Sequence, residues 1–161
     1  AKLIIKKTKC DAVKMEYNGK NYEIIQSVVR LGIPVMGHIG FTPQYYKKFK
    51  VQGVMENDRQ KLIKEAKENE KAGVFSIVVE CVTSQAAKEI TQSLKIPTIG
   101  IGSSKYCDGQ ILVTDDMLGL SGFYPKFVKK FARLSNIIVK GVQKYNKDVL
   151  TKKFPSKKNN F

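Results

Sequence analysis

Short apolar runs alternate with amphipathic stretches along most of this chain. Each apolar run is bounded by Gly, Pro, Asn or Asp, as β-strands usually are. The runs are largely apolar on both faces, which is typical of parallel strands buried under helices. The predicted strands are Ala12–Met15, Ile33–Ile39, Val74–Val79, Ile96–Ile101 and Ile111–Val113.

The stretches between these runs carry apolar residues at helical spacing. Their ends bear suitable residues, with Asn, Asp or Ser at the start and Gly after the last apolar position. The segment Ala1–Lys7 resembles the end of a helix, and Thr151–Phe161 resembles a basic, loosely held tail. We predict helices over Asn21–Arg30, from Asn57 or Asp58 to Gly73, from Ser84, from Pro125 and over Asn136–Val149.

Strand and helix in regular alternation predict an α/β fold with parallel strands and right-handed crossovers. Both a barrel and an open doubly wound sheet fit this order. No glycine-rich phosphate-binding motif is present, so the sequence gives the nucleotide-binding doubly wound sheet no support. An eight-stranded α/β barrel has about 250 residues, whereas this chain has 161. We therefore expect a barrel to need a further N-terminal segment.

The charge is the unusual feature of the composition, with 29 Lys and Arg against 14 Asp and Glu and a net charge of +15. Such a charge suits a nucleic-acid or anionic-membrane binder, or simply a lysine-rich solvated surface. Only three of the 29 basic residues are arginines, Arg30, Arg59 and Arg133. No nucleic-acid-binding motif is present, and we favour the solvated surface over a nucleic-acid partner.

Three cysteines without paired spacing predict reduced thiols in a cytoplasmic protein rather than a disulfide framework or a zinc site. No signal-peptide pattern is visible, and no apolar run is long enough to span a bilayer. We expect a cytoplasmic protein with no membrane partner.

Polar residues that could carry chemistry stand at the ends of successive predicted strands. Lys14 and Glu16 are two apart, so they share one face of the first strand, as a site or as a structural ion pair. Glu80 follows an apolar run, which would partly desolvate its carboxylate and suit acid/base chemistry; a solvated loop carboxylate is the alternative. His38, between Gly37 and Gly40, could serve a site or pack as an ordinary buried residue.

Two further segments also allow either a functional or a purely structural interpretation. Gly100–Ser103 and Asp108-Gly109 could line a site or simply form turns. Because the carboxyl ends of parallel strands meet at one edge, we predict that Lys14, His38, Glu80 and Gly102 converge there.

Several ordered motifs, taken together, resemble the ketopantoate hydroxymethyltransferase (3-methyl-2-oxobutanoate hydroxymethyltransferase) family over nearly the whole chain. Asp116–Leu120, Pro125–Val128 and Phe154-Pro155 fit the same family. The motifs that carry the resemblance are Pro34–Gln44, Phe49–Gly53, Val79–Val82, Ile96–Gly102 and Cys107–Val113.

The resemblance implies a (β/α)8 TIM barrel of the phosphoenolpyruvate/pyruvate-binding kind. Residues 1–150 would be the C-terminal part of this single domain, with strands four to eight and the terminal helices, and residues 151–161 a basic tail. It also implies hydroxymethyl transfer from 5,10-methylenetetrahydrofolate to 3-methyl-2-oxobutanoate in pantothenate biosynthesis. The implied cofactor is a divalent cation, usually Mg²⁺, and the implied assembly is a homo-oligomer.

Carried over position by position, the resemblance assigns Glu16 to the metal, Lys14 to the carboxylate of the 2-oxo acid, Glu80 to catalysis as acid/base, and His38 to the lining of the substrate site. The family's two metal-binding aspartates, with the adjacent serine, belong to earlier strands and have no counterpart here. The chain also departs from the family at residues 47–48, at Val54 and at Ser103-Ser104. A basic α/β binding module and an inactive remnant are the alternatives to an enzyme.

Overall fold

The computed structural model describes residues 1–46 and 48–160. Lys47, one of the departures from the family, lies outside the described residues. The chain forms two compact units, Ala1–Ile111 and Leu112–Phe161, each described here by itself. The assignment of residues 1–150 to one domain and of residues 151–161 to a tail stays a prediction.

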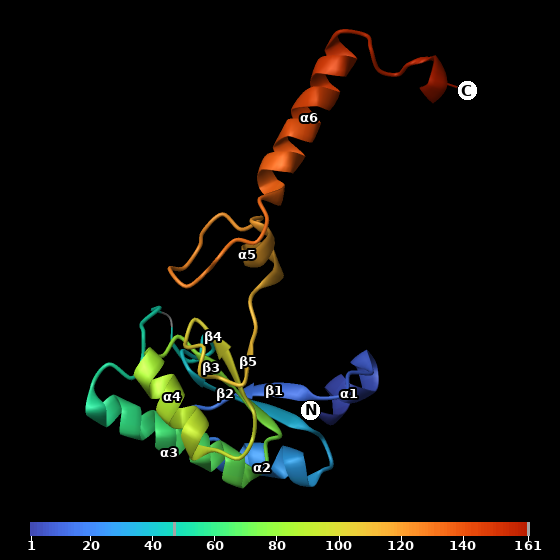
Figure 1. The fold of residues 1–161 in the computed structure, drawn as a ribbon. Coiled ribbons are helices and arrows are strands. Elements are labelled where there is room, and N and C mark those ends of the chain that lie inside the picture. The colour runs from blue at the N-terminus through green and yellow to red at the C-terminus, as the bar shows by residue number, and fades with distance from the viewer. Residues whose placement is uncertain (47, 161) are drawn as a thin grey trace. The chain divides into compact units, whose positions relative to one another are not determined.

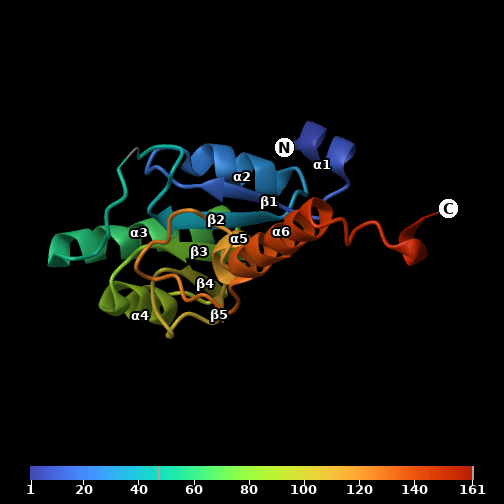
Figure 2. The same cartoon turned by 90° about the horizontal axis from the view of Figure 1, so that it is seen from above.

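The first unit is built on a parallel sheet, and within the described residues this sheet has five strands. Their spatial order, β1-β2-β3-β4-β5, is the order of the chain (Figures 1 and 2). This confirms the predicted α/β class and places four of the predicted strands correctly to within a few residues. The strands are β1 Val13–Glu16, β2 Val35–Gly40, β3 Ser76–Glu80, β4 Thr98–Ile101 and β5 Gly109–Gln110.

The helices of this unit precede or separate the strands, as predicted. They are α1 Lys2–Thr8, α2 Tyr22–Arg30, α3 Glu56–Ala72 and α4 Ser84–Ser93. Thr83 precedes α4, and its hydroxyl accepts a hydrogen bond from the Ala86 amide, which satisfies a free N–H of the first turn. Gly73 ends α3 with a φ of 92°, a left-handed conformation that glycine adopts without strain.

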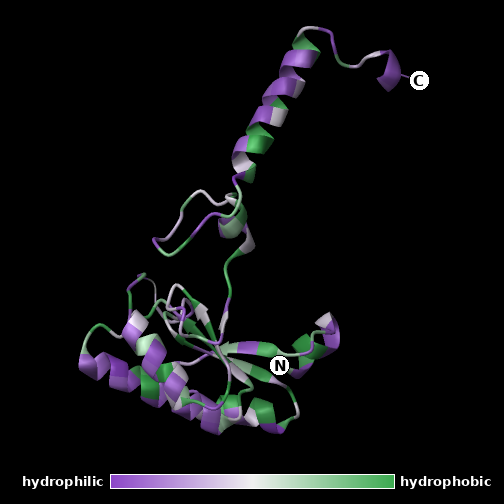
Figure 3. Ribbon diagram, viewed as in Figure 1, coloured by the Kyte–Doolittle hydropathy of each residue, from purple (hydrophilic) through white to green (hydrophobic). Residues whose placement is uncertain are grey.

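The sheet buries one face under helices, and this face holds the hydrophobic core. Figure 1 shows α2, α3 and α4 on the same side of the sheet. A doubly wound sheet has helices on both faces, so this arrangement argues against that alternative. Most of α3 is hydrophilic in Figure 3, and its few buried residues complete the core. The central members of the core are Ile25, Val35, Ile39, Leu62, Ala66, Ile77, Val79, Ala86, Ala87 and Ile90.

The fifth strand was predicted at the wrong residues. Pairing with β4 occurs at Gly109 and Gln110 rather than over Ile111–Val113. A Cβ on Gly109 would lie 2.8 Å from Ile99 Cδ1, so glycine allows the two strands to approach closely. Ile111 donates one more hydrogen bond to Gly100, at 3.0 Å, and the pairing then stops. The apolar run is about half exposed, with Ile111 at 49%.

The second unit contains α5 Thr114–Leu118, α6 Leu134–Leu150 and a short 3₁₀ helix at Lys157–Asn159. The structure confirms the last predicted helix as α6, but the helix predicted from Pro125 is wrong. Pro125 begins only a turn, closed by the Val128 amide at 2.9 Å. The amide of Phe131 donates to Met117 at the end of α5 instead of to a helical partner four residues earlier.

No helix in residues 1–46 and 48–160 is both long and apolar enough to cross a membrane.

Candidate active site

The predicted site residues do converge at one edge of the sheet. In the strand register, Glu16 lies opposite His38, Gly40 opposite Glu80, and Glu80 opposite Ile101, which precedes Gly102. Glu16 and Glu80 therefore lie at the same, carboxyl-terminal end of their strands. The prediction of convergence is confirmed.

The alternation of strand side chains places these residues on one face. Val35, Ile39, Ile77 and Val79 point into the core beneath the helices. Residues displaced by one position point to the opposite face, and Lys14, Glu16, His38 and Glu80 occupy such positions in β1, β2 and β3. A polar face can form here because the hydrophobic core is built from the opposite face of the sheet and the helices that cover it.

His38 is the centre of this polar cluster. Its side chain is buried, with 1% of the residue exposed. Nδ1 lies 3.1 Å from the ammonium nitrogen of Lys14 and 3.8 Å from Oε1 of Glu16. Nε2 lies 3.0 Å from Oε2 of Glu80. Three strands thus bring a cation, an imidazole and two carboxylates within one small volume.

Lys14 reaches this cluster from the solvent-exposed side. In the described part of the chain Lys14 contacts His38 and forms no ion pair with Glu16. The alternative of a Lys14–Glu16 structural ion pair is therefore wrong. An ammonium has three N–H donors and His38 engages one, so the others are available to an anionic ligand.

Glu16 is fixed by hydrogen bonds that the sequence did not indicate. Its carboxylate is buried, and Oε2 accepts a hydrogen bond of 2.9 Å from the backbone amide of Gln44. The side chain of Asn21 donates to the backbone oxygen of Glu16 at 2.8 Å. These bonds connect the loop after β2 and the start of α2 to the end of β1, which holds the carboxylate in place.

Glu80 is largely buried, with 19% of its side chain exposed. The partial desolvation predicted from the apolar run is therefore present. Its backbone oxygen accepts a hydrogen bond from Phe41 at 2.9 Å, which connects the ends of β3 and β2. A carboxylate beside an imidazole at a strand end, with limited access to water, is suited to accepting a proton from a bound substrate.

Cys81 follows Glu80 and is not a nucleophile at neutral pH. Burial, and then the neighbouring charge of Glu80, raise the pKa of its thiol from 9.0 to about 12. The thiol therefore stays protonated, and only a thiolate is a strong nucleophile.

Asp108 forms a turn and does not line the polar cluster. Oδ2 of Asp108 accepts hydrogen bonds from the amide and the hydroxyl of Thr98, at 2.8 and 3.0 Å. Thr98 begins β4, so Asp108 lies at the opposite end of the sheet from the polar cluster. Asp108 is a structural residue of the turn. Ser104, in contrast, follows the end of β4 and contacts the hydroxyl of Ser84 at 2.9 Å.

A divalent cation such as Mg²⁺ prefers several oxygen ligands, and the polar cluster supplies only part of such a set. Glu16 offers Oε1, a hard oxygen donor that lies 3.8 Å from His38 Nδ1. The nitrogens of His38 already face Lys14 and Glu80. Among residues 1–46 and 48–160, no three His, Cys, Asp or Glu side chains are placed to hold one metal ion. Glu16 fits as one carboxylate ligand, and the described residues alone do not complete a site.

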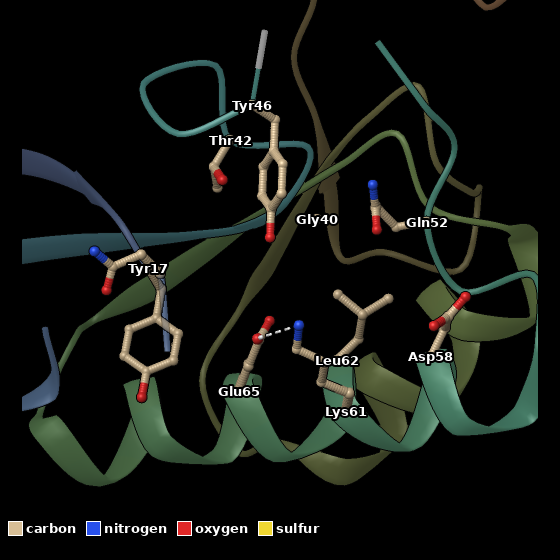
Figure 4. A pocket seen from close by; sticks show the side chains of 10 residues that line it. Tyr17, Gly40, Thr42, Tyr46, Gln52, Asp58, Lys61, Leu62 and Glu65 are labelled. Atoms are coloured by element: carbon tan, nitrogen blue, oxygen red, sulfur yellow. Dashed lines mark ion pairs between the residues drawn. The ribbon is translucent and has the colours of Figure 1, made fainter. Parts of the chain in front are cut away.

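A separate small pocket of about 50 Å³ lies between the loop after β2 and α3 (Figure 4). Tyr17, Thr42, Gln52, Lys61 and Glu65 line it, and the side chains of the polar cluster do not. Burial raises the pKa of Glu65, and the charge of Lys61 partly opposes this shift. A volume of this size accommodates a few water molecules, and no sequence motif predicts it.

Comparison with known proteins gives one consistent family. A sequence model described as ketopantoate hydroxymethyltransferase matches residues 1–157. The 3-methyl-2-oxobutanoate hydroxymethyltransferase of Pelagibacter ubique (strain HTCC1062) is 48% identical over 161 residues, covering 100% of this chain and 63% of that protein. The protein of the same name from Thermosipho africanus (strain TCF52B) is 51% identical over 159 residues, covering 96% and 60%.

This chain thus spans about 60% of the length of these curated relatives. Among solved structures, dihydrodipicolinate synthase from Oceanobacillus iheyensis gives a TM-score of 0.33 at 15% identity, over 50% of this chain and 26% of that one. A likeness of that size supports no inference. The family match, in contrast, extends over nearly the whole sequence. The chain belongs to the ketopantoate hydroxymethyltransferase family.

Proposed function

We propose that this protein takes part in hydroxymethyl transfer from 5,10-methylenetetrahydrofolate to 3-methyl-2-oxobutanoate, which yields 2-dehydropantoate for pantothenate biosynthesis. Family membership supports this reaction. The observation that carries the proposal is the placement of Lys14 and Glu80 at hydrogen-bond distance from the two nitrogens of His38, at the strand ends. A nucleic-acid-binding module does not require that arrangement.

In this proposal Lys14 binds the carboxylate of the 2-oxo acid. Its ammonium is exposed on one side and contacts His38 on the other. A charge-assisted hydrogen bond from Lys14 would orient the substrate with its C3 carbon toward the interior of the cluster. His38 lines the same position.

Glu80 is the proposed base. Its carboxylate accepts the proton from C3, the C3–H bond breaks, and its electron pair delocalises into the adjacent carbonyl group as an enolate. One water hydrolyses methylenetetrahydrofolate, which breaks both bonds from nitrogen to the methylene carbon and releases tetrahydrofolate and formaldehyde. The enolate carbon attacks the formaldehyde carbon and forms the new C–C bond. The C=O π pair becomes an alkoxide, which takes the proton held by Glu80 and gives the hydroxymethyl group. Limited exposure of Glu80 keeps water away from the reacting carbon and strengthens the nearby electrostatic interactions.

A divalent cation such as Mg²⁺, when bound, would supply positive charge beside the oxygen atoms of the 2-oxo acid. Glu16 would be one of its ligands, through Oε1, since Oε2 is engaged by Gln44. The other ligands would come from outside the described residues.

We further propose that the sheet is part of a (β/α)8 barrel. The sequential strand order and the helices on one side support this architecture. Three more strands, whichever chain supplies them, would close the barrel over the polar face and complete the metal site. The assembled enzyme is proposed to be a homo-oligomer, which light scattering would test.

The direct test is the formation of 2-dehydropantoate from 3-methyl-2-oxobutanoate and methylenetetrahydrofolate with Mg²⁺. The protein is assayed alone and after addition of the N-terminal part of the Pelagibacter ubique relative, with Glu80→Gln as the matched control. We expect turnover only in the completed assembly and only with Glu80 intact. Full turnover by residues 1–161 alone would show that the metal ligands are assigned wrongly. A folded, completed assembly without turnover would contradict the proposed reaction.

A second measurement separates the enzyme from a basic binding module. The affinity of a basic module for nucleic acid would fall steeply as the salt concentration is raised, because its binding releases counterions from the nucleic acid. Turnover that requires the divalent cation, with no salt-sensitive nucleic-acid binding, supports the enzyme.

A further inference from the structure

The two nitrogens of His38 face neighbours of opposite hydrogen-bonding character. Nδ1 lies 3.1 Å from Lys14 Nζ, and Nε2 lies 3.0 Å from Oε2 of Glu80. In a neutral imidazole one nitrogen is a donor and the other an acceptor, and the neighbours decide which.

The two neighbours at hydrogen-bond distance select the same tautomer, and Oε1 of Glu16, 3.8 Å from Nδ1, is too far away for a hydrogen bond. An ammonium group has donors and no lone pair, so Nδ1 must be the acceptor in its contact with Lys14. A carboxylate has lone pairs and no proton, so Nε2 must carry the hydrogen where it faces Glu80. The reverse tautomer would direct an N–H at the Lys14 ammonium and a lone pair at the Glu80 carboxylate.

From this geometry we propose that His38 is a positioning residue for Glu80. Lys14 fixes the ring as the Nε2–H tautomer, and Nε2–H then holds Oε2 of Glu80, so that Oε1 is presented to the C3 hydrogen of the oxo acid. The inference rests on the proposed function, since it assigns His38 a role in that reaction. It goes beyond lining the substrate site, because His38 acts here through the base.

His38 and Glu80 lie at hydrogen-bond distance, but the angle between them is not that of a hydrogen bond. The nitrogen–oxygen distance is that of a hydrogen bond. Within the described residues, however, no acceptor is aligned with the buried Nε2. A buried N–H without an aligned partner gains stability when an acceptor turns toward it. Catalytic hydrogen bonds are often poorly aligned without substrate and tighten when it binds.

The ring itself has little freedom to make this adjustment, which leaves it to Glu80. His38 is 1% exposed, and its backbone oxygen accepts a 2.8 Å hydrogen bond from the amide of Tyr17. The side chain of Glu80 is 19% exposed, so its carboxylate is less enclosed than the ring. In this proposal the carboxylate turns toward the N–H of His38.

Two amide substitutions separate the two nitrogens. In His38→Gln the amide nitrogen can occupy the place of Nε2, so the donor to Glu80 is kept. In His38→Asn the shorter side chain reaches only the place of Nδ1, so the donor to Glu80 is lost while a polar group remains beside Lys14. Both variants are uncharged and similar in polarity, which makes each the control for the other.

The assay is solvent-deuterium exchange at C3 of 3-methyl-2-oxobutanoate, measured in the completed assembly with Mg²⁺. We expect His38→Asn to lower the exchange rate by about 10²-fold, the effect of a misplaced catalytic group. The KM for the oxo acid should change by less than about three-fold, and His38→Gln should recover most of the rate. In a Glu80→Gln background, His38→Asn should cost less than about two-fold, because His38 acts through Glu80.

A spectroscopic measurement tests the tautomer without reference to activity. The nitrogen-15 NMR shifts of His38, assigned by their loss in His38→Gln, should show hydrogen on Nε2 and none on Nδ1. Lys14→Met should abolish this preference. Hydrogen on Nδ1, or on both nitrogens, would overturn the proposal.

The kinetic outcomes also separate failure of this inference from failure of the proposed function. A wild-type assembly that does not catalyse exchange would contradict the proposed function itself. An active wild type in which His38→Asn and His38→Gln lose the same activity, or in which the loss is entirely in KM, would contradict only the positioning role.

Discussion

Gly40 is the position where a single added carbon should disturb the candidate site most. Its φ is +89°, and a Cβ built there would lie 2.1 Å from the backbone oxygen of Glu80 and 2.8 Å from Val82 Cγ1. A left-handed conformation costs an L-residue about 1–2 kcal/mol. Inserting a methyl group against packed atoms costs about 1–3 kcal/mol more. We therefore expect Gly40→Ala to lower the free energy of unfolding by about 2–5 kcal/mol.

Gly32→Ala is the matched control for this substitution. Gly32 also has a positive φ, +75°, but its added Cβ would meet no atom within 4 Å. It should lose only the conformational part, about 1–2 kcal/mol. The difference between the two variants isolates the contact between Gly40 and the strand end that carries Glu80.

The free energy of unfolding of both variants is measured by urea denaturation. Circular dichroism is the probe, because the protein has seven Tyr but no Trp to report unfolding by fluorescence. Gly40→Ala should also slow hydroxymethyl transfer, because the clash displaces the backbone of Glu80. Equal losses of stability in the two variants would refute the reasoning. So would an unchanged transfer rate in a folded Gly40→Ala variant.

Other substitutions test the surrounding structure. Thr83→Ala should lower the free energy of unfolding by about 1 kcal/mol through loss of the α4 cap, and Thr83→Ser, which keeps the hydroxyl, should not. Asp108→Ala should destabilise β4 by about 1–3 kcal/mol, because the Thr98 amide loses its acceptor; a loss of transfer rate in the folded variant would contradict its structural role. The thiol of Cys81 keeps its proton to about pH 12 when folded and releases it near 9.0 when unfolded, so stability should fall as pH rises above about 9. In pH-dependent urea denaturation Cys81→Ala should show a smaller fall, and an identical fall would contradict the assigned pKa.

The polar cluster could be predicted because two simple periodicities coincide. Lys14 and Glu16 share a strand face since side chains alternate, and Glu80 ends a neighbouring parallel strand. Parallel strands end at one edge, so convergence follows without knowledge of the tertiary structure. The contact between Lys14 and His38 did not follow, because the register that places them together depends on the whole sheet.

Interactions made by the backbone left no signal in the sequence. The amide of Gln44 holds Glu16, and every residue except proline has such an amide. Asp108 was ambiguous because its partner, Thr98, is ten residues earlier and is brought near only by the β4–β5 pairing.

The two errors in the fold have a related cause. The spacing of Phe127, Val128 and Phe131 fits a helix, but the Phe131 amide bonds to Met117, a tertiary contact that overrides the local pattern. Ile111–Val113 is apolar without being paired as a strand. Hydrophobicity indicates which segments tend to be buried, and it does not by itself indicate which backbone groups pair.

The central claim is that Glu80 removes the proton from C3 of 3-methyl-2-oxobutanoate. The most direct measurement is solvent-deuterium exchange into this oxo acid by the completed assembly, with Mg²⁺ and without folate. Glu80→Gln keeps the size and hydrogen bonding of the side chain but removes its basicity. The account predicts exchange by the wild type and a rate about 10²–10⁴-fold lower in Glu80→Gln, with oxo-acid binding retained. Exchange at an unchanged rate in Glu80→Gln would contradict it.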